Sequence, residues 1–96
     1  MKKVAEPDNT TSVTFKLPAA VHAQQVCVCG DFNDWDETRH PMSRSPDGSF
    51  SVTIALRRGR SYRFRYLLDG RRWENDWSAD DYVPNHFGGQ DSVVEV

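Results

Sequence analysis

Hydrophobic and polar residues alternate with a period of two in several short runs of this chain. The clearest runs cover residues 13–17, 26–29, 50–56 and 62–68, and a last short run closes the chain at 92–96. Alternation with this period places successive side chains on opposite faces of a β-strand. No stretch carries the 3.6-residue periodicity of an amphipathic helix. The pattern therefore predicts an all-β chain.

Turn-forming residues separate these runs. Pro46-Asp47-Gly48 precedes the third run, and Asp69-Gly70 follows the fourth. Asp-Gly pairs favour the primed turns that match strand twist, so we expect hairpins at both sites. About seven short strands at this spacing predict an antiparallel β-sandwich.

The segments outside the alternating runs are mostly polar. Residues 1–10 are expected to form a flexible N-terminal arm, and residues 75–91 a long, Gly-rich return loop. Residues 11–96 remain as one domain, because a chain of 96 residues is long enough for a single modest core.

Composition and charge exclude several classes of partner. The formal net charge is -2, whereas binding to nucleic acid or anionic membranes is led by Lys and Arg. The first residues lack the apolar stretch of a signal peptide, and no segment approaches transmembrane length. We therefore expect a cytoplasmic protein with no nucleic-acid or membrane partner.

The only two cysteines, Cys27 and Cys29, lie two residues apart in a predicted strand. Their side chains project to the same face, and a bridge between them would distort an extended backbone. No second cysteine pair or suitably spaced histidine pair completes a zinc site. Both thiols are therefore expected to be reduced and free of metal.

Carboxylates are plentiful, yet they form no recognisable catalytic motif. Nearly all of them lie in predicted turns, where Asp bonds to its own backbone. The histidines are scattered, and no nucleophile-elbow, zinc-protease or phosphate-loop motif occurs. In the stretch GDFNDWD, Asp31 and Asn33 fit a calcium loop, but Trp35 takes the place of the third ligand. We expect no catalysis, no metal and no cofactor.

Arginines cluster with aromatic residues around the fourth run, a pattern that can indicate nucleic-acid binding. Strand parity argues against a stacking platform, because Tyr62, Phe64 and Tyr66 face one side while Arg63 and Arg65 face the other. The rings are expected in the core and the arginines on a solvated sheet face. Binding of an anionic ligand to that face remains an alternative.

Three tryptophans, Trp35, Trp73 and Trp77, follow turn residues and stand among Asn, Asp, Glu and Arg. Tryptophan in a small sandwich usually belongs to the core, but this setting indicates that more than one is partly exposed. An exposed indole can stack on the apolar face of a pyranose ring while nearby polar groups bond to its hydroxyls. The pattern is consistent with a sugar ligand.

Four stretches of the chain resemble a known family: VCVCGDFNDWD (26–36), MSRSPDGSFSVTIAL (42–56), YRFRYLLDGRRW (62–73) and FGGQDSVVEV (87–96). They are similar to the early-set N-terminal domains of isoamylases and glycogen branching enzymes. They are equally similar to the glycogen-binding domain of the AMP-activated protein kinase beta subunit. Together these domains form carbohydrate-binding module family 48. The resemblance implies an immunoglobulin-like β-sandwich that binds α-1,4-linked glucan or malto-oligosaccharide without cleaving it, since the barrel of glycoside hydrolase family 13 enzymes is absent.

The resemblance also implies which residues bind the glucan. Two indoles stack on glucose rings, a basic residue joins them, a large apolar residue inserts against the chain, and a polar residue precedes the closing strand. By position these are Trp35, Trp73, Arg65, Phe87 and Asp91. Asp91 stands where the family has an amide, and Gly89 replaces a residue that carries a hydroxyl group.

The hairpin before Trp73 is one residue longer than the family's usual spacing, and its loop decides where the ring points. With a two-residue turn, Trp73 opposes Tyr66 and points into the core. With a three-residue, bulge-like loop, Trp73 opposes Leu67 and shares the outer face with Arg65. We predict the longer loop, because it keeps Arg71 out of the core.

A docking module is the rival interpretation. Many domains of this type pack against a neighbouring domain or subunit, and the same exposed rings could be hot spots of a protein interface. The partner would then be a glucan-metabolising enzyme or a kinase-type complex, and the affinity for sugar would be small.

Overall fold

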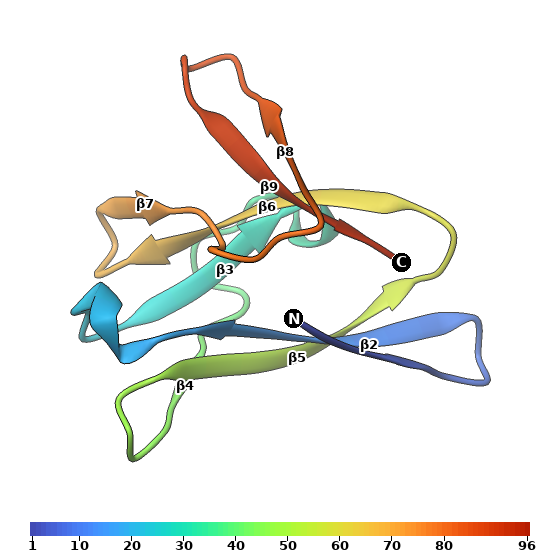
Figure 1. The fold of residues 1–96 in the computed structure, drawn as a ribbon, viewed down its shortest axis with the longest axis horizontal. Helices are drawn as coiled ribbons and strands as arrows, with labels where there is room; N and C mark the ends of the chain where they lie inside the picture. Colours follow the sequence, from blue (N-terminus) through green and yellow to red (C-terminus); the bar gives the residue numbers. More distant parts are fainter.

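Two antiparallel β-sheets pack face to face in the computed structural model, which describes residues 1–96 (Figure 1). The first sheet has the order β1 (Lys2–Ala5), β2 (Thr10–Leu17), β5 (Phe50–Arg57) and β4 (Ser43–Arg44). The second has the order β3 (Val26–Gly30), β6 (Ser61–Leu68), β9 (Gln90–Glu95) and β8 (Asp81–Pro84), and β7 (Arg72–Glu74) also pairs with β6. The only helical segments are two short 3-10 turns, η1 (Ala19–Val21) and η2 (Asp31–Asn33), so no helix could span a membrane. The predicted antiparallel sandwich is confirmed.

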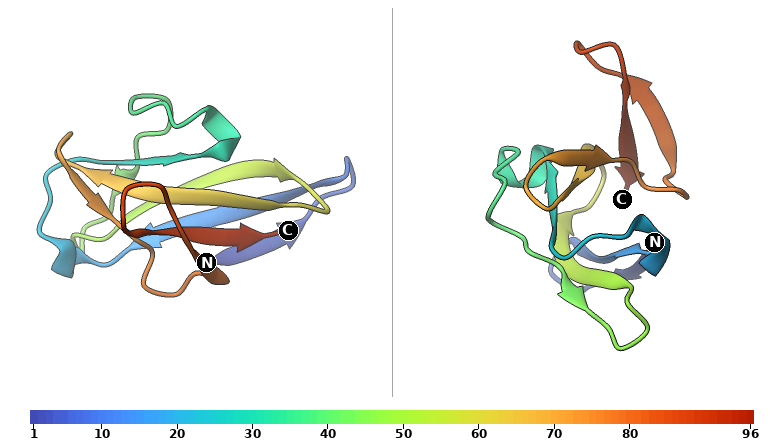
Figure 2. Two further views of the ribbon diagram at one scale, coloured as in Figure 1. Left: turned by 90° about the horizontal axis from the view of Figure 1, so that it is seen from above. Right: turned by 90° about the vertical axis from the view of Figure 1, so that its left-hand side faces the viewer.

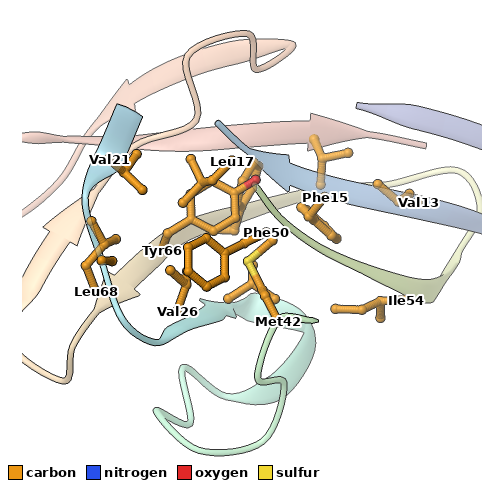
Figure 3. Packing of buried hydrophobic residues seen from close by; sticks show 14 of the residues in the cluster. Val13, Phe15, Leu17, Val21, Val26, Met42, Phe50, Ile54, Tyr66 and Leu68 are labelled. Atoms are coloured by element: carbon orange, nitrogen blue, oxygen red, sulfur yellow. The ribbon is translucent and has the colours of Figure 1, made fainter. Parts of the chain in front are cut away.

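The core lies between the sheets and contains 16 buried apolar side chains. Leu17 from the first sheet lies beside Tyr66 from the second (Figure 3). Phe15 contacts Phe64 across the sheets, and all four side chains are 0% exposed. The rings of Phe15 and Phe64 pack edge to face, with their centroids 5.0 Å apart. The predicted parity of residues 62–66 is also confirmed, since the aromatic residues face inward and the arginines outward.

The structure has nine strands where the alternation predicts about seven. β1 lies within residues 1–10, the predicted arm, and pairs with β2. β8 lies within residues 75–91, the predicted loop, and pairs with β9. Every residue of β1 is exposed and β8 is mostly exposed, so neither edge strand has a buried face that would impose alternation. The expectation of irregular structure is therefore wrong for residues 2–5 and 81–84, while residues 75–80 and 85–89 do form connecting loops.

Both predicted Asp-Gly hairpins are present. Asp47-Gly48 lies in the connection from β4 to β5, and Asp69-Gly70 lies between β6 and β7. In the second hairpin φ is 54° at Asp69 and 71° at Gly70, and positive values at both central positions are those of a type I′ turn.

The two cysteines are free thiols on β3, as the sequence predicts. Cys29 is 0% exposed, although it points away from the core between the sheets. Burial raises the pKa of Cys29 to about 11, so its thiol stays protonated at neutral pH.

Candidate functional site

The stretch GDFNDWD folds into a tight turn that Asn33 holds from the inside. Asn33 is 2% exposed. Its Oδ1 accepts a hydrogen bond from the Gly30 N–H at 3.0 Å, and its Nδ2 donates to the Val28 carbonyl at 3.0 Å and contacts His40 Nδ1 at 2.8 Å. The buried amide is thereby fully bonded, as burial requires. Phe32 packs against the hydrophobic core and so anchors the turn to the sandwich.

Gly30 lies where this turn meets β6. A Cβ atom on Gly30 would be 2.5 Å from the carbonyl oxygen of Arg63 and 2.8 Å from the Cβ atom of Phe64. The carbonyl oxygen of Arg63 is part of the backbone of β6, and the Cβ atom of Phe64 is bonded to that backbone. Because β6 is paired with β3, neither atom can move away easily. Glycine at this position lets the turn begin directly against the second sheet.

Trp35 has a left-handed backbone conformation that a side chain of this size rarely adopts. Its φ is 57°, and the φ of the preceding Asp34 is also 57°. The Trp35 N–H donates to the Gly30 carbonyl at 2.9 Å, and the indole Nε1–H donates to Asp31 Oδ1 at 3.0 Å. Such a conformation persists only where surrounding contacts impose it, and it is concentrated at functional sites. The turn thus holds a half-buried indole in one orientation.

Trp73 reaches the outer face of the second sheet through the register of the β6–β7 hairpin. It pairs with Leu67, and Arg72 pairs with Leu68, which confirms the predicted three-residue loop. Arg71 is the additional residue, and it forms a bulge after the turn. Trp73 is 39% exposed, so the indole lies outside the core, as predicted.

Arg65 contacts both indoles. Its guanidinium carbon lies 5.9 Å from the ring centre of Trp35 and 4.9 Å from that of Trp73. The two indole centroids are 6.4 Å apart, with 65° between the ring planes. β9 pairs with β6 as far as Phe64, and β7 pairs with β6 from Tyr66 onward, so Arg65 lies on β6 between the segments that face these two strands. Cation–π attraction helps to hold the three side chains together as one cluster.

Asp91 lies on the other side of Arg65. The β6–β9 register, continued one step beyond the Phe64–Ser92 pair, places Asp91 across from Arg65. Arg65 Nε is 3.1 Å from Asp91 Oδ1, and Arg63 Nη1 is 3.8 Å from Asp91 Oδ2. The first contact is an ion pair without hydrogen-bond geometry, since the buried Nε has no hydrogen-bond partner. Asp91 is 6% exposed, so its carboxylate faces the arginines rather than solvent.

Phe87 stands near the tip of the β8–β9 hairpin, which projects from the sandwich in Figures 1 and 2. Its side chain is 88% exposed. Asn85 shapes the tip, because its Oδ1 accepts from the Phe87 and Gly89 N–H groups at 2.9 and 3.1 Å. Asn85 Nδ2 also donates to Asp91 Oδ1 at 3.2 Å. The Asp91 carboxylate therefore links the hairpin tip to Arg65.

A hollow of about 300 Å³ lies between the indole cluster and the hairpin tip. Its lining includes four of the five predicted site residues, Trp35, Arg65, Phe87 and Asp91, together with Asp31, Arg63, Asn85 and His86. The fifth, Trp73, adjoins it through its contact with Trp35. A larger hollow of about 510 Å³ beside the β6–β7 turn is lined only by polar residues, so it offers no ring for stacking. We take the aromatic hollow and the two indoles, hereafter the indole site, as the candidate site.

The indole site offers aromatic faces and guanidinium donors, which suits a neutral ligand rich in hydroxyl groups. Its carboxylates are already engaged, Asp31 by Trp35 and by the Arg63 N–H at 2.9 Å, and Asp91 by the arginines. No group of three or more His, Cys, Asp or Glu side chains is placed to hold a metal ion. The arrangement supports binding by stacking and hydrogen bonding.

Two residues that shape the indole site were not predicted from the sequence. From the sequence, Asp31 is an ordinary turn-forming residue. Its role in orienting Trp35 follows only from the hydrogen bond that the indole N–H donates to it in the structure. Asn85 reads as part of a polar loop, although an Asn two residues before Phe87 is a known signal for a side-chain-capped turn. Trp77 lies outside the hollow.

Comparison with known proteins identifies relatives of this chain. The family model for carbohydrate-binding module 48 (isoamylase N-terminal domain) matches residues 4–83. The chain is 36% identical over 89 residues to the 1,4-alpha-glucan branching enzyme GlgB of Thiobacillus denitrificans, an alignment covering 88% of this chain and 11% of that enzyme. It is 40% identical over 70 residues to the enzyme of the same name from Burkholderia lata, covering 70% of this chain and 9% of that enzyme. The matched region is thus a small part of these relatives, and the 96 residues described here contain the sandwich and no catalytic barrel.

Proposed function

The chain belongs to the carbohydrate-binding module 48 family, and from that premise we propose that it binds α-1,4-linked glucan at the indole site without cleaving it. The relatives that it matches are named 1,4-alpha-glucan branching enzymes, which supports this class of ligand. Residues 11–96 would act as one binding domain for glycogen- or starch-type polymer and for malto-oligosaccharides.

The observation that carries this proposal is the contact of one guanidinium with two surface indoles. Arg65 touches the rings of both Trp35 and Trp73, whose planes meet at 65°. Two coplanar rings would form a flat platform, whereas rings at this angle form a bent one. An α-1,4-linked chain curves, so successive glucose units can stack on two inclined faces while Arg65 donates to their hydroxyls.

We assign different roles to the remaining predicted residues. Phe87 is the contact residue, because its ring is 88% exposed above the hollow. Asp91 is a positioning residue, since its nearly buried carboxylate pairs with Arg65 and accepts from Asn85. The hydroxyl that the family carries at position 89 is absent here, and Gly89 adds only backbone groups.

The affinity of such a site is expected to be weak. The platform is open, and two stacking rings with few hydrogen-bond donors correspond to dissociation constants on the order of micromolar to millimolar, or about 4–8 kcal/mol. The rings are already held by Asp31 and Arg65, so little side-chain freedom is lost on binding.

Titration with maltoheptaose, followed by tryptophan fluorescence, tests the proposal, with retention on glycogen as a second readout. We expect saturable binding by the parent and a loss of about tenfold or more in Trp35→Ala and in Trp73→Ala. Val4→Ala is the matched control, because Val4 is 45% exposed but lies on β1, outside the indole site. Equal retention of Trp35→Ala and parent would contradict the site.

The same titration separates the rival functions. No fluorescence change at tens of millimolar maltoheptaose would favour the docking interpretation. Binding that falls steeply with added salt would favour an anionic ligand on the arginine face, whereas sugar stacking should be nearly insensitive to salt.

We also propose a cytoplasmic location. The two free thiols of Cys27 and Cys29 are consistent with a reducing compartment. Selective labelling of the cytoplasmic and exported fractions of the host cell, followed by immunodetection of the chain, tests this location.

A further inference from the structure

A second exposed indole stands on the loop between β7 and β8, away from the indole site. Trp77 is 57% exposed, more than Trp73. The hollow beside it measures about 290 Å³ and is lined by Met1, Lys16, Pro18, Asp76, Trp77 and Ser78. None of these residues lines the hollow of the indole site. The Trp77 hollow therefore lies where the loop from the second sheet meets the end of β2 in the first.

The loop that carries this indole is fixed by a buried polar cluster centred on Asp76. Asp76 is 5% exposed, and its Oδ2 accepts from the Tyr66 hydroxyl at 2.6 Å. Its N–H donates to Ser92 Oγ at 2.9 Å, and its carbonyl accepts from the Tyr82 hydroxyl at 2.7 Å. Three strands thus hold one residue of the loop, and a fully bonded buried network of this kind is rigid.

The indole of Trp77 is itself held in one orientation. Its Nε1–H donates to Glu74 Oε2 at 3.0 Å. The polar edge of the ring is therefore satisfied within the protein, and what the ring offers outward is its apolar face. A rigid aromatic side chain loses little conformational entropy when a ligand covers it.

The Trp77 hollow repeats the chemical composition of the indole site. Each has an indole, a cation and a nearly buried carboxylate: Trp77, Lys16 and Asp76 in one, and Trp35, Arg65 and Asp91 in the other. The two hollows are also of nearly equal size, about 290 and 300 Å³. The core of a protein–protein interface is depleted of charged residues, whereas the lining of this hollow includes Lys16 and Asp76.

We propose that the Trp77 hollow is a second binding site for α-glucan, with the face of Trp77 stacking on a glucose ring and Lys16 donating to a hydroxyl. This inference rests on the proposed function, since it takes the ligand class from the indole site. One indole instead of two makes the second site the weaker one, with a dissociation constant on the order of 1 mM or above. Two sites on one small domain let it hold two segments of the same polymer, which raises affinity for polymer above that for short oligosaccharides.

Indole ¹⁵N–¹H resonances test this site residue by residue. The chain has three tryptophans, so a labelled sample gives three indole cross-peaks, which single Trp→Phe variants assign. We expect the Trp77 peak to shift and saturate during a maltoheptaose titration, with its own dissociation constant. The shift should persist in Trp35→Ala, where the indole site is damaged, and Lys16→Met should weaken it while leaving the Trp35 and Trp73 peaks unchanged.

The outcomes separate the two proposals. A Trp77 peak that stays still while the Trp35 and Trp73 peaks move overturns the second site and leaves the proposed function intact. A Trp77 shift that disappears in Trp35→Ala also overturns it, because the shift then reports on the indole site. If no indole peak moves, both proposals fail, whereas movement of Trp77 alone supports the second site and contradicts the first.

Polymer binding gives an independent check. Trp77→Ala should lower the apparent affinity for glycogen by about tenfold or more, while maltotriose binding reported by the fluorescence of the two remaining tryptophans is unchanged. Unchanged affinity for glycogen would overturn the role of two sites in polymer binding. Because Trp77 is exposed and the neighbouring Asp76 fixes the loop through its own bonds to Tyr66, Ser92 and Tyr82, this variant is expected to fold.

Discussion

The carboxylate of Asp31 links the indole of Trp35 to the backbone of β6. Asp31 Oδ1 accepts from Trp35 Nε1 at 3.0 Å, and Asp31 Oδ2 accepts from the Arg63 N–H at 2.9 Å. One side chain thus joins the turn after β3 to the strand that carries Arg65. Asp31 therefore fixes the Trp35 ring relative to the strand whose Arg65 guanidinium the ring contacts.

Replacement of Asp31 by Ala is expected to weaken glucan binding without unfolding the domain. The Trp35 ring keeps its contacts with Trp73 and Arg65 but loses the bond that fixes its rotation, so the affinity for maltoheptaose should fall by about three- to tenfold. Asp47→Ala is the matched control, because Asp47 also caps a turn but lies in the β4–β5 hairpin. Calorimetry measures the change, and equal affinities for the two variants would contradict the role of Asp31.

Replacement of Gly30 by Ala is expected to destabilise the domain. The new Cβ would lie 2.5 Å from the Arg63 carbonyl oxygen, and overpacking against a fixed backbone costs about 2–3 kcal/mol. Gly89→Ala is the control, since its nearest neighbour would be 3.6 Å from the added Cβ and the change should stay within about 0.5 kcal/mol. Urea unfolding compares the two, and a Gly30→Ala variant as stable as the parent would show that β3 can move away from β6.

Acid is expected to weaken the turn through His40. Asn33 Oδ1 is bonded to a backbone N–H, so the Asn33 Nδ2 amide must be the donor to His40 Nδ1, which is then unprotonated. Burial, together with the nearby charge of Arg39, lowers the pKa of His40 below its usual value of 6.5, and Asp36 partly opposes this. As the pH falls through 6.5 the unfolded chain binds a proton that the folded chain does not, so stability is lost as the pH falls toward the lowered pKa of folded His40.

His40→Gln isolates this contribution. The Gln side-chain oxygen can accept from Asn33 but cannot titrate, so the variant should lose less stability than the parent when the pH falls from 7 to 5. All other ionisable groups are the same in both proteins, so their contributions cancel in the comparison. Chemical unfolding at several pH values measures the two slopes, and identical slopes would exclude His40 as a cause of acid sensitivity.

The sequence predicts the sandwich because its central strands have one buried face, which imposes period-two alternation. β1 and β8 were not predicted, because these exposed edge strands have no buried face that would require hydrophobic and polar residues to alternate. Within the indole site, strand parity and hairpin register predict the positions of Arg65 and Trp73. The pairing of Asp91 with Arg65 depends on the register of β9, which no short-range signal fixes.

Removal of Arg71 tests the link between loop length and the indole site. In the structure Arg71 is the additional residue of the β6–β7 connection, and Trp73 pairs with Leu67. Deleting Arg71 leaves Asp69-Gly70 as a two-residue loop, whose positive φ values already suit a type I′ turn. Arg72 would then follow Gly70 directly and still oppose Leu68, so we expect Trp73 to keep its place on the outer face, with glucan affinity within about twofold of the parent.

Removal of both Arg71 and Arg72 is the opposing variant. With the same two-residue turn, Trp73 would oppose Leu68 and its ring would point toward the core, because a shift of one residue reverses the face of a strand. Glucan affinity should then fall at least as far as in Trp73→Ala, with a loss of stability from overpacking. Fluorescence titration and urea unfolding of the two deletions, side by side, measure both effects. Loss of binding in the single deletion, or its retention in the double deletion, would show that register does not place Trp73.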